Sequence, residues 1–585
     1  MIWFRLPTVV ILAAVVLLPV GVVVYQSVLD EPFFSPAARL SLASYAFVLG
    51  EPDFARAFVT SVVLAAGMTA IAVPLGGLLA FLVVRTDLPA KHLIEPALLV
   101  PIVLSPIVIA FGYVVAIGPV GFASLAVKGL IGFVPWNLYS LTSLIIIAGL
   151  THVPHVYLFS SASLRKINLE LEEQARILGA APWRVALTIS LPLVWPALVY
   201  SGVLIFFLGF ELFGLPLVIG DPANVLVLTT YLFKLTNILG TPSYQLMAVV
   251  VVAIALVTLP LVYFQRHLLR VAERYVTVGG RGGQSGPLRL GRWRWLALAC
   301  IAAWLAIAIV LPLSGVLLRA FVSRWGEGIN PFDTLTLQNF RDLAEHPNLM
   351  GSIINTFLLA TVGAAVSVAA YGLIALVTHR WRSHFVAMVD YLVLLPRSLP
   401  GLVAGLAFLW VFLFVPYLGV LRSSLVGIWL AYSVVWLAFG LRLISASLSQ
   451  IAPELEEAAR IAGAGPARVM RDVTVPLIRF GLVSSWLLCF MIFVREYSTG
   501  VYLQGPGTEV LGALIEIGEA GLRPGLGLLD HDRLERRHVL PSLDVVLVSR
   551  FRRSYHLAAP AFTNVGNKGT LASHDPSVAL HLTFL

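Results

Sequence analysis

Long apolar runs separated by short polar segments make up the chain as far as about residue 520. A helix needs about 20 mainly apolar residues to cross the hydrocarbon core of a bilayer. Eleven runs approach or exceed that length, so the pattern predicts an all-α, polytopic membrane protein. The predicted spans are 7–28, 58–84, 93–117, 141–163, 197–219, 245–264, 294–318, 353–378, 386–414, 424–444 and 478–500.

The spans fall into two sets whose sequences resemble each other. The segment RAFVTSVVLAAG at 56–67 parallels GSIINTFLLATVG at 351–363, and LLVPIVLSP at 98–106 parallels LLPRSLP at 394–400. Internal similarity on this scale indicates a tandem duplication. Repeats with an even number of spans are parallel and related by an axis along the membrane normal. We therefore expect two tandem parallel repeats of about six transmembrane helices, with about 11–12 spans in all.

The repeats set the expected domain boundaries. The first repeat covers 1–264 and the second covers 294–520. Between them, 265–293 is basic and rich in Gly, and we interpret it as a cytoplasmic linker. The tail at 521–585 breaks the pattern, because it contains no apolar run long enough for a twelfth span. We hypothesise that a reading-frame change near 515–525 replaced that span, and a natural, divergent tail is the alternative.

Composition narrows the class of protein further. The chain is 59% hydrophobic and 12% charged, with a mean hydropathy of +0.92, which excludes a soluble domain. The net charge of +9 does not indicate nucleic-acid binding, because Lys and Arg are spread between the apolar runs. Cys300 and Cys489 lie far apart in apolar runs, which argues against a disulfide framework. The N-terminal run lacks a convincing cleavage site, so we interpret it as a membrane helix.

Two polar segments are near copies of each other. Residues 170–199 read ELEEQARILGAAPWRVALTISLPLVWPALV, and residues 454–483 read ELEEAARIAGAGPARVMRDVTVPLIRFGLV. They match at 16 of 30 positions without a gap, at a constant offset of 284. Each copy lies between apolar runs, so each is predicted to be a loop between membrane helices. A polar loop present twice in one membrane protein suggests a docking surface for a two-fold symmetric partner.

The shared pattern is Glu-Glu-x-Ala, a Gly four residues after the Ala, and a later Leu/Val-Pro-Leu step. It resembles the EAA loop of ABC importer permeases, and the resemblance covers about residues 1–520. In that family the loop forms a short coupling helix that docks on a separate cytoplasmic ATPase. The carried-over positions are Glu172, Glu173, Ala175 and Gly179 in the first copy and Glu456, Glu457, Ala459 and Gly463 in the second. The first copy departs slightly, since Gln174 stands where the family usually has Ala.

Each loop is predicted to fold as helix–turn–helix. Glutamates suit the first turn of a helix, where the macrodipole favours anions. Gly179 and Gly463 can adopt the left-handed conformation that ends a helix, and Pro182 and Pro466 suit the start of a second one. An amphipathic helix that only rests on lipid is the alternative. The apolar face of the first helix is predicted to comprise Leu171, Ala175 and Leu178 in one copy and Leu455, Ala459 and Ala462 in the other.

Charge predicts the orientation of the loops and the partners they meet. With the N-terminus inside, roughly 20 Lys and Arg lie on the inner side against about nine outside, and both loops are cytoplasmic. No GxxxxGK[ST] phosphate loop occurs, since GNKGT at 566–570 lacks the spacing. We therefore expect no cofactor in this chain, with ATP used by a cytoplasmic ABC ATPase dimer. The resemblance further implies a periplasmic substrate-binding protein, surrounding membrane lipid, and a multi-pass location in a bacterial inner membrane.

Charged residues inside predicted spans are candidates for a translocation pathway. Glu211 lies in FFLGFELFGLPLVIG, and Arg495 and Glu496 lie in FMIFVREYSTGVYL, late in the span after each loop. Such groups are costly in a membrane unless they pair or line a cavity. A pathway or gate near the outer mouth is one interpretation. An ion pair between helices, or side chains that reach the interface, is the other.

Prolines interrupt the third span of each repeat. They are Pro101 and Pro106 in the first, and Pro396 and Pro400 in the second. Broken helices often line a pathway, although Pro kinks also occur in ordinary membrane helices. Arg397, between two of these prolines, is therefore a further pathway candidate. No cluster has metal-ligand spacing, and we interpret His152 and His155 as packing residues.

Among ABC permeases the chain is most similar to the iron(III)-type, which have this fused layout; FELFGLPLVIGDP and LEEAARIAGA carry the similarity. The resemblance implies a permease subunit, not an enzyme, that passes a substrate, ferric iron first among the candidates. Permeases for thiamine, aminoethylphosphonate and polyamines share the loop and remain alternatives. An ion-coupled secondary transporter should carry more carboxylates or His in its spans. A membrane enzyme should carry a catalytic cluster near the interface.

Overall fold

The computed structural model describes residues 2–165, 169–237, 243–274, 288–326, 328–329, 331–379, 384–396 and 399–512. Within these ranges the regular structure is helical, apart from three isolated β-bridges. Eight described helices are long and apolar enough to cross a membrane, and three pairs bent at a short break bring the number up to 11. The prediction of an all-α, polytopic membrane protein is confirmed. The tail at 521–585, with its frame-change hypothesis, lies outside the described residues.

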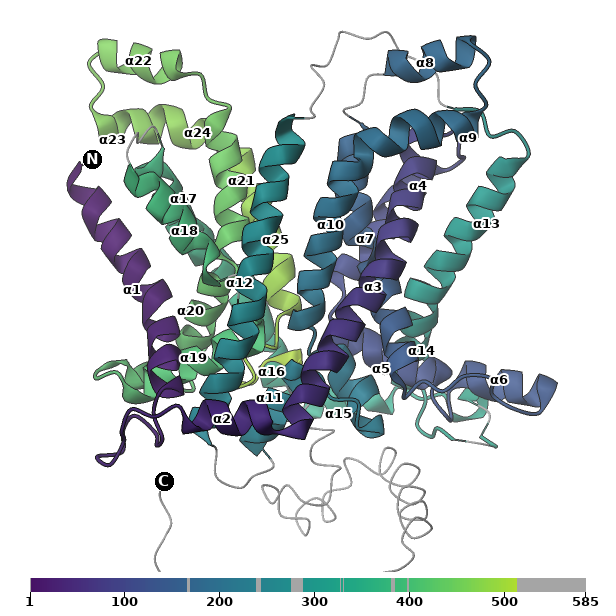
Figure 1. The fold of residues 1–585 in the computed structure, drawn as a ribbon, viewed down its shortest axis with the longest axis horizontal. Helices are drawn as coiled ribbons and strands as arrows, with labels where there is room; N and C mark the ends of the chain where they lie inside the picture. The colour runs from purple at the N-terminus through teal and green to yellow at the C-terminus, as the bar shows by residue number, and fades with distance from the viewer. Residues whose placement is uncertain are drawn as a thin grey trace, which may run out of the picture. The chain divides into compact units, whose positions relative to one another are not determined.

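The described helices follow the two predicted sets of spans. In the first half they are α1 (Ile2–Ser27), α2 (Ala43–Gly50), α3 (Pro52–Arg85), α4 (Lys91–Val103), α5 (Pro106–Ile117), α6 (Phe122–Ile131), α7 (Leu141–Leu164), α8 (Leu169–Ile177), α9 (Pro182–Val185), α10 (Leu191–Glu211), α11 (Leu228–Asn237) and α12 (Tyr244–Arg274). Figure 1 shows their arrangement. α12 continues to Arg274, into the segment predicted to be the linker.

The described part of the second half repeats this order as far as the span that corresponds to α10. Its helices are α13 (Trp293–Leu305), α14 (Leu311–Ala320), α15 (Gln338–Glu345), α16 (Pro347–Leu358), α17 (Ala364–Thr378), α18 (His384–Leu394), α19 (Gly401–Phe414), α20 (Leu425–Val435), α21 (Leu437–Ser449), α22 (Pro453–Ile461), α23 (Pro466–Val469), α24 (Val475–Leu477) and α25 (Arg479–Arg495). A π-helical turn, η6 (Leu359–Gly363), joins α16 to α17, so the two form one candidate span.

The third span of each half is broken near Pro106 in the first half and between Leu394 and Gly401 in the second, whereas Pro101, also predicted to interrupt its span, lies inside α4. α4 ends at Val103 and α5 begins at Pro106, while α18 ends at Leu394 and α19 begins at Gly401, directly after Pro400. Proline lacks a backbone N–H and disfavours the helical region for the preceding residue, which favours the end of a helix before it. The spans after the two loops end earlier than predicted, since α10 ends at Glu211 and α25 at Arg495.

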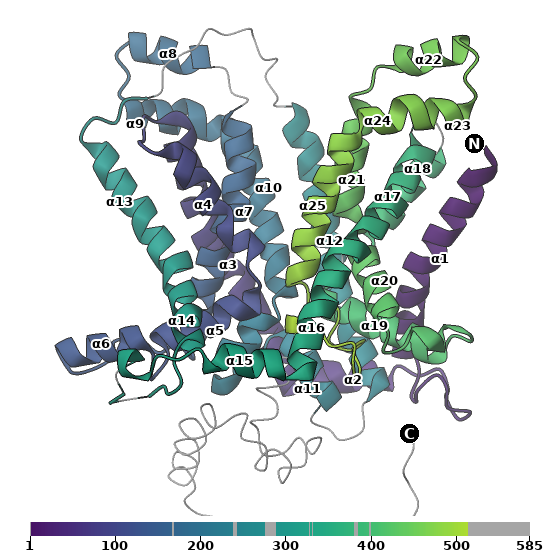
Figure 2. The ribbon, with the colours of Figure 1, turned by 180° about the vertical axis from the view of Figure 1, so that it is seen from behind.

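The first helix of each half packs against the other half. α1 contacts α17, α18 and α19, and its Val9, Leu12 and Val16 belong to a buried cluster made otherwise of second-half residues. In the same way, Figures 1 and 2 show α13 beside first-half helices. This exchange interlocks the two repeats, and the sequence did not predict it.

Small residues let the helices of the exchanged contact approach closely. A Cβ placed on Gly112 of α5 would overlap with the Pro312 carbonyl group of α14, and one on Gly315 would overlap with the Gly112 carbonyl oxygen. The Tyr113 hydroxyl donates a hydrogen bond to the Ile307 carbonyl at 2.9 Å. Close backbone approach through small residues is a common basis of helix association in membranes.

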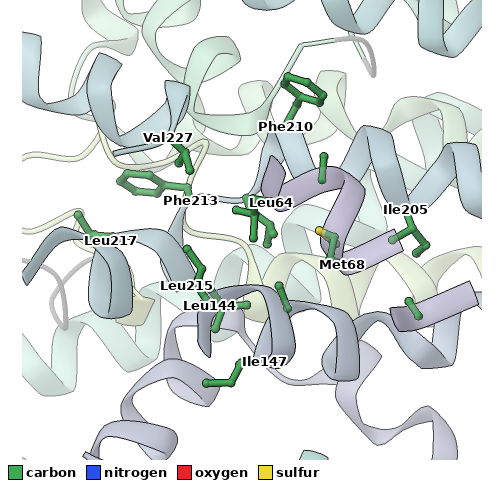
Figure 3. Packing of buried hydrophobic residues seen from close by; sticks show 14 of the residues in the cluster. Leu64, Met68, Leu144, Ile147, Ile205, Phe210, Phe213, Leu215, Leu217 and Val227 are labelled. Atoms are coloured by element: carbon green, nitrogen blue, oxygen red, sulfur yellow. The ribbon is translucent and has the colours of Figure 1, made fainter. Parts of the chain in front are cut away.

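The core of the first half forms where α3, α7 and α10 meet. Leu64 and Met68 of α3 and Leu144 of α7 are fully buried there, and Figure 3 shows them beside side chains of α10. The segment after α10 also enters this core, because Phe213 and Leu217 are buried. The segment that follows α10 is therefore packed into the core of the first half.

Candidate functional site

Both repeated loops fold as helix–turn–helix, as predicted. In the first, α8 is followed by Gly179 with a φ of +85° and then by α9, which begins at Pro182. In the second, α22 is followed by Gly463 with a φ of +86° and then by α23, which begins at Pro466. Such positive φ values favour glycine. Figures 1 and 2 show α8 and α22 at the same end of the helices as the N-terminus.

The first loop is held by a buried carboxylate. Glu172 of α8 is 3% exposed, and its Oε1 accepts a hydrogen bond from the Ser190 hydroxyl at 2.9 Å. The same oxygen lies 3.4 Å from Nε of Arg85, the last residue of α3, and both side chains are only 4% exposed. A buried carboxylate is stable only when it is paired and hydrogen-bonded. Glu172 therefore ties α8 to the end of a membrane span.

The second loop has the same arrangement with different partners. Glu456 of α22 is 6% exposed, and its Oε1 accepts a hydrogen bond from the Thr474 hydroxyl at 3.2 Å. His379, the residue that follows α17, places Nε2 3.1 Å from the same oxygen. Glu172 and Glu456 are equivalent in the two repeats, and so are Ser190 and Thr474. We call the two groups, Arg85–Glu172–Ser190 and His379–Glu456–Thr474, the first and second buried nodes.

The neighbouring positions point outwards. Glu457 is exposed and Glu173 is half-buried, in contrast to the glutamate that precedes each. The predicted apolar face is not one surface, because Ala175 and Ala459 are half-buried while Leu178 is 87% exposed. Leu455 and Ala462 are also exposed, and the side chain of Leu171 lies outside the described residues. The most exposed large apolar side chains of the loops, besides Leu178, are the equivalent Ile177 and Ile461, at 84% and 88%.

The charged candidates in the spans lie in equivalent segments after α10 and α25. Glu211 ends α10 and is half-buried, and Arg495, its equivalent at an offset of 284, ends α25. Arg495 donates through Nη1 to the carbonyl of Ile102, near the end of α4, so it crosses from the second half to the first. A cation at a helix C-terminus stabilises the unpaired carbonyls there. Arg397 lies outside the described residues.

Glu496 is hydrogen-bonded through both carboxylate oxygens. Its Oε1 accepts from the Ser498 hydroxyl at 2.7 Å and from the Thr499 N–H and hydroxyl at 3.0 Å each. Its Oε2 accepts from Trp436 Nε1 at 3.2 Å. These contacts hold the turn that follows α25. Glu496 therefore stabilises this turn, while its role in a translocation pathway stays a prediction.

A stacked aromatic pair joins the two segments across the halves. Phe213 and Tyr497, again separated by 284 positions, have ring centroids 6.1 Å apart and ring planes at 29°. Both are buried. This pair was not predicted from the sequence. When the offset of 284 is extended beyond the loops, it marks the two positions as equivalent. Equivalent residues that contact each other indicate the position of the pseudo-two-fold axis.

The predicted packing role of the two histidines agrees with their surroundings. The rings of His152 and His155 stack with centroids 5.4 Å apart, and Nδ1 of His152 lies 2.7 Å from the Ala148 carbonyl oxygen. Among the described residues, no group of three or more His, Cys, Asp or Glu is placed to hold a metal ion. Cys300 is exposed and Cys489 is buried, and neither forms a disulfide.

Comparison with known proteins identifies the family. Residues 72–273 and 371–524, together more than half of the chain, match the family described as binding-protein-dependent transport system inner membrane component. The chain belongs to this family. The two separate matches confirm the tandem duplication, and the family and the apolar helices together make the chain a multi-pass protein of the bacterial inner membrane.

Individual relatives are permeases of different transport systems. The chain is 25% identical over 441 residues to the ferric transport system permease protein FbpB of Actinobacillus pleuropneumoniae, covering 73% of this chain and 62% of the relative. It is 23% identical over 485 residues to the Fe(3+)-transport system permease protein FbpB 2 of Haemophilus influenzae, covering 82% and 87%. The molybdenum transport system permease protein ModB of Escherichia coli is 26% identical over 215 residues, covering 36% and 93%. The chain thus spans less than two thirds of the A. pleuropneumoniae protein.

Proposed function

We propose that this chain is the permease subunit of an ABC importer that passes ferric iron from a periplasmic binding protein across the inner membrane. It is not itself an enzyme and holds no cofactor. ATP is hydrolysed by a separate cytoplasmic ATPase dimer, and membrane lipid surrounds the spans. The observation that carries the proposal is the pair of equivalent loops at one end of the helices (Figure 1), each a short helix ended by a left-handed glycine.

The loops are suited to docking because each presents apolar side chains that the chain itself does not cover. Ile177 and Leu178 in the first loop, and Ile461 in the second, are more than four-fifths exposed. The buried nodes hold the opposite side of each helix. A rigid helix with one anchored face and one exposed apolar face suits a stable protein contact. We assign the coupling role to Glu173, Ala175 and Gly179 and to Glu457, Ala459 and Gly463, with Glu172 and Glu456 as the anchors.

Ferric iron is proposed as the cargo because two relatives that match most of this chain are named for ferric or Fe(3+) transport. Relatives named for molybdenum and putrescine transport match about a third of the chain or less. Substrate choice is tested by uptake of ⁵⁵Fe(III) in cells that express the chain with its ATPase and binding protein. Uptake of molybdate or putrescine, with no iron uptake, would reassign the cargo and leave the permease assignment intact.

The permease assignment is tested by co-purification with candidate ATPase subunits from the same genome. Wild-type chain should retain an ATPase, and the double variant Gly179→Asp with Gly463→Asp should lose it, because each change strains the turn and also places a negative charge beside the exposed apolar side chains of the docking surface. A Cβ at either glycine meets open space, so the variants should not disturb the core. Binding by neither chain would favour another class, such as an ion-coupled secondary transporter.

A further inference from the structure

Each buried node holds one end of a membrane span, and hydrogen bonds hold the opposite end of the same span. In the first half this span is α3, and in the second it is α16–η6–α17. The inner tie is the buried node itself, through Arg85 in one half and His379 in the other. The nodes occur in both repeats although the basic partners differ. Retention of the contact in two diverged copies, with a different basic partner in each, indicates that it serves a purpose common to both.

The outer ties are also equivalent between the repeats. In the first half, the Leu228 N–H donates to the Ser61 hydroxyl of α3 at 2.9 Å, and both residues are 1% exposed. In the second half, the Leu511 N–H donates to the Thr356 hydroxyl of α16 at 2.9 Å, and Thr356 is 3% exposed. Asn355 adds hydrogen bonds from Nδ2 to the carbonyls of two residues just before Leu511.

The atoms held at the outer ties belong to the segments that follow α10 and α25. Leu228 begins α11, downstream of Phe213, and Leu511 lies downstream of Tyr497. Phe213 and Tyr497 form the aromatic stack between the halves. Each of these two spans therefore connects a repeated loop at one end with the segment that forms the interface between the halves at the other end.

The ties are separated by the thickness of a membrane. Arg85 lies 24 residues after Ser61, which corresponds to about 36 Å at 1.5 Å per residue. His379 lies 23 residues after Thr356, which corresponds to about 34 Å. The hydrocarbon core of a bilayer is about 30 Å thick. A helix of this length connects the two surfaces directly.

Packing between the ties leaves little room for the rod to bend. A Cβ on Gly76 of α3 would approach the Val156 side chain of α7 to 2.5 Å, and one on Gly67 would approach Ile145 to 2.7 Å. Figure 3 shows Leu64 and Met68 of the same helix enclosed by their neighbours. Apolar packing alone fixes a helix in a membrane weakly against sliding, whereas buried hydrogen bonds fix its register.

We propose that α3 and α16–η6–α17 are rods that carry movement of the repeated loops across the membrane. Arg85 and His379 are the positioning residues at the inner end, and Ser61 and Thr356 are those at the outer end. The proposal rests on the proposed function, because an ATPase must move the loops. Without the ties, the loops would still move but the interface between the halves would not follow.

Two spin-label distances on the full chain, bound to its ATPase, test the rods. Labels at Thr188→Cys and Asp472→Cys, equivalent exposed positions outside the docking side chains, report the loops, and labels at Ala223→Cys and Tyr417→Cys, also exposed, report the opposite end. Exposed Cys300 is replaced by Ser and buried Cys489 is kept. In the wild type, trapping the ATPase with Mg-ATP and vanadate should shorten the loop distance and shift the outer distance.

The variants separate the two ends. Arg85→Leu with His379→Leu, which removes the donor at each inner tie, and separately Ser61→Ala with Thr356→Ala, should keep the shortening at the loops and lose the shift at the outer end. Transport per ATP hydrolysed should fall in both. Ser61→Thr should restore the shift, because it keeps the hydroxyl. Arg56→Gln, in an exposed ion pair with Asp53 on α3, is the matched control and should behave as wild type.

The outcomes distinguish failure of the rods from failure of the proposed function. An outer shift that persists at wild-type size in both double variants would overturn the rods, while the permease assignment stands. A wild-type loop distance that does not respond to Mg-ATP, or a chain that binds no ATPase, would overturn the proposed function and the rods with it. The Ser61→Ala change removes one hydroxyl group only, so a folding defect in the Arg85→Leu chain does not leave the test open.

Discussion

The two buried nodes have one geometry and two chemistries. In the first, a guanidinium from the end of α3 lies against Glu172, and in the second an imidazole from beyond α17 lies against Glu456. Arg85 is charged at any physiological pH, whereas an imidazole can donate a hydrogen bond while neutral. The shared requirement is thus a donor at the end of the span and not a fixed charge. The first node depends on charge pairing, and the second can be held by hydrogen bonds alone.

The largest expected effect comes from removing the carboxylate charges. Glu172→Gln should destabilise the protein by about 3 kcal/mol, because it leaves the Arg85 charge buried without its carboxylate. Glu456→Gln should cost only about 1 kcal/mol, because the imidazole of His379 can still hydrogen-bond to the amide that replaces the carboxylate. The measurement is thermal unfolding in detergent. Unfolding is monitored as the reaction of a thiol reagent with buried Cys489, in a Cys300→Ser background. Equal shifts in the two variants would remove the proposed difference between the nodes.

The next effect concerns the equivalent segments after α10 and α25. Glu496→Gln should cost about 2 kcal/mol, since its carboxylate accepts four hydrogen bonds and each is stronger when the acceptor is charged. Glu211→Gln should cost less, because that side chain is half-buried at the end of its helix. The same unfolding assay compares them. A larger loss for Glu211→Gln would show that the first half depends on this position more than its geometry suggests.

A smaller effect is expected at the two turn glycines, and there the halves should agree. Gly179→Val and Gly463→Val should each weaken ATPase binding by a factor that corresponds to about 1–2 kcal/mol, the cost of a left-handed conformation. Gly179→Asn and Gly463→Asn should cost less, because Asn tolerates that region. Binding isotherms of the purified ATPase on the four variants give these values. Wild-type affinity in both Val variants would show that the turns do not shape the docking surface.

Exchanging the basic partners should have the smallest effect. His379→Arg brings the first node's chemistry to the second and should be nearly neutral, while Arg85→His should cost about 1 kcal/mol or less as long as the imidazole can donate to Glu172. The unfolding assay, with transport as a second readout, checks both. A severe loss for His379→Arg would mean that the second node excludes a fixed charge, contrary to the shared geometry proposed here.

Local patterns in the sequence predicted the loops well. The spacing of Glu, Gly and Pro is short-range, so helix, left-handed turn and second helix follow from residues within a few positions of one another. The breaks at Pro106 and Pro400 are equally local. The repeat offset extended these predictions from one half to the other.

Contacts between distant positions could not be predicted in the same way. Arg85 and Glu172 lie 87 positions apart, and only the packed helices bring them together. The resemblance to the EAA loop also assigned the same coupling role to both adjacent glutamates. In the structure, Glu172 is buried and Glu173 is partly exposed, because they lie on different sides of α8. The exchange of α1 and α13 between the halves depends on tertiary packing that hydrophobicity alone does not specify.

The central claim is that one chain offers two equivalent docking loops, and the composition of the assembled complex tests it most directly. Native mass spectrometry of the permease purified with its ATPase should give one copy of this chain with two ATPase subunits. Gly179→Asp alone, or Gly463→Asp alone, should leave complexes with a single ATPase subunit. A wild-type complex of one chain with one ATPase, or of two chains with two, would contradict the claim that the repeats are two docking sites in one polypeptide.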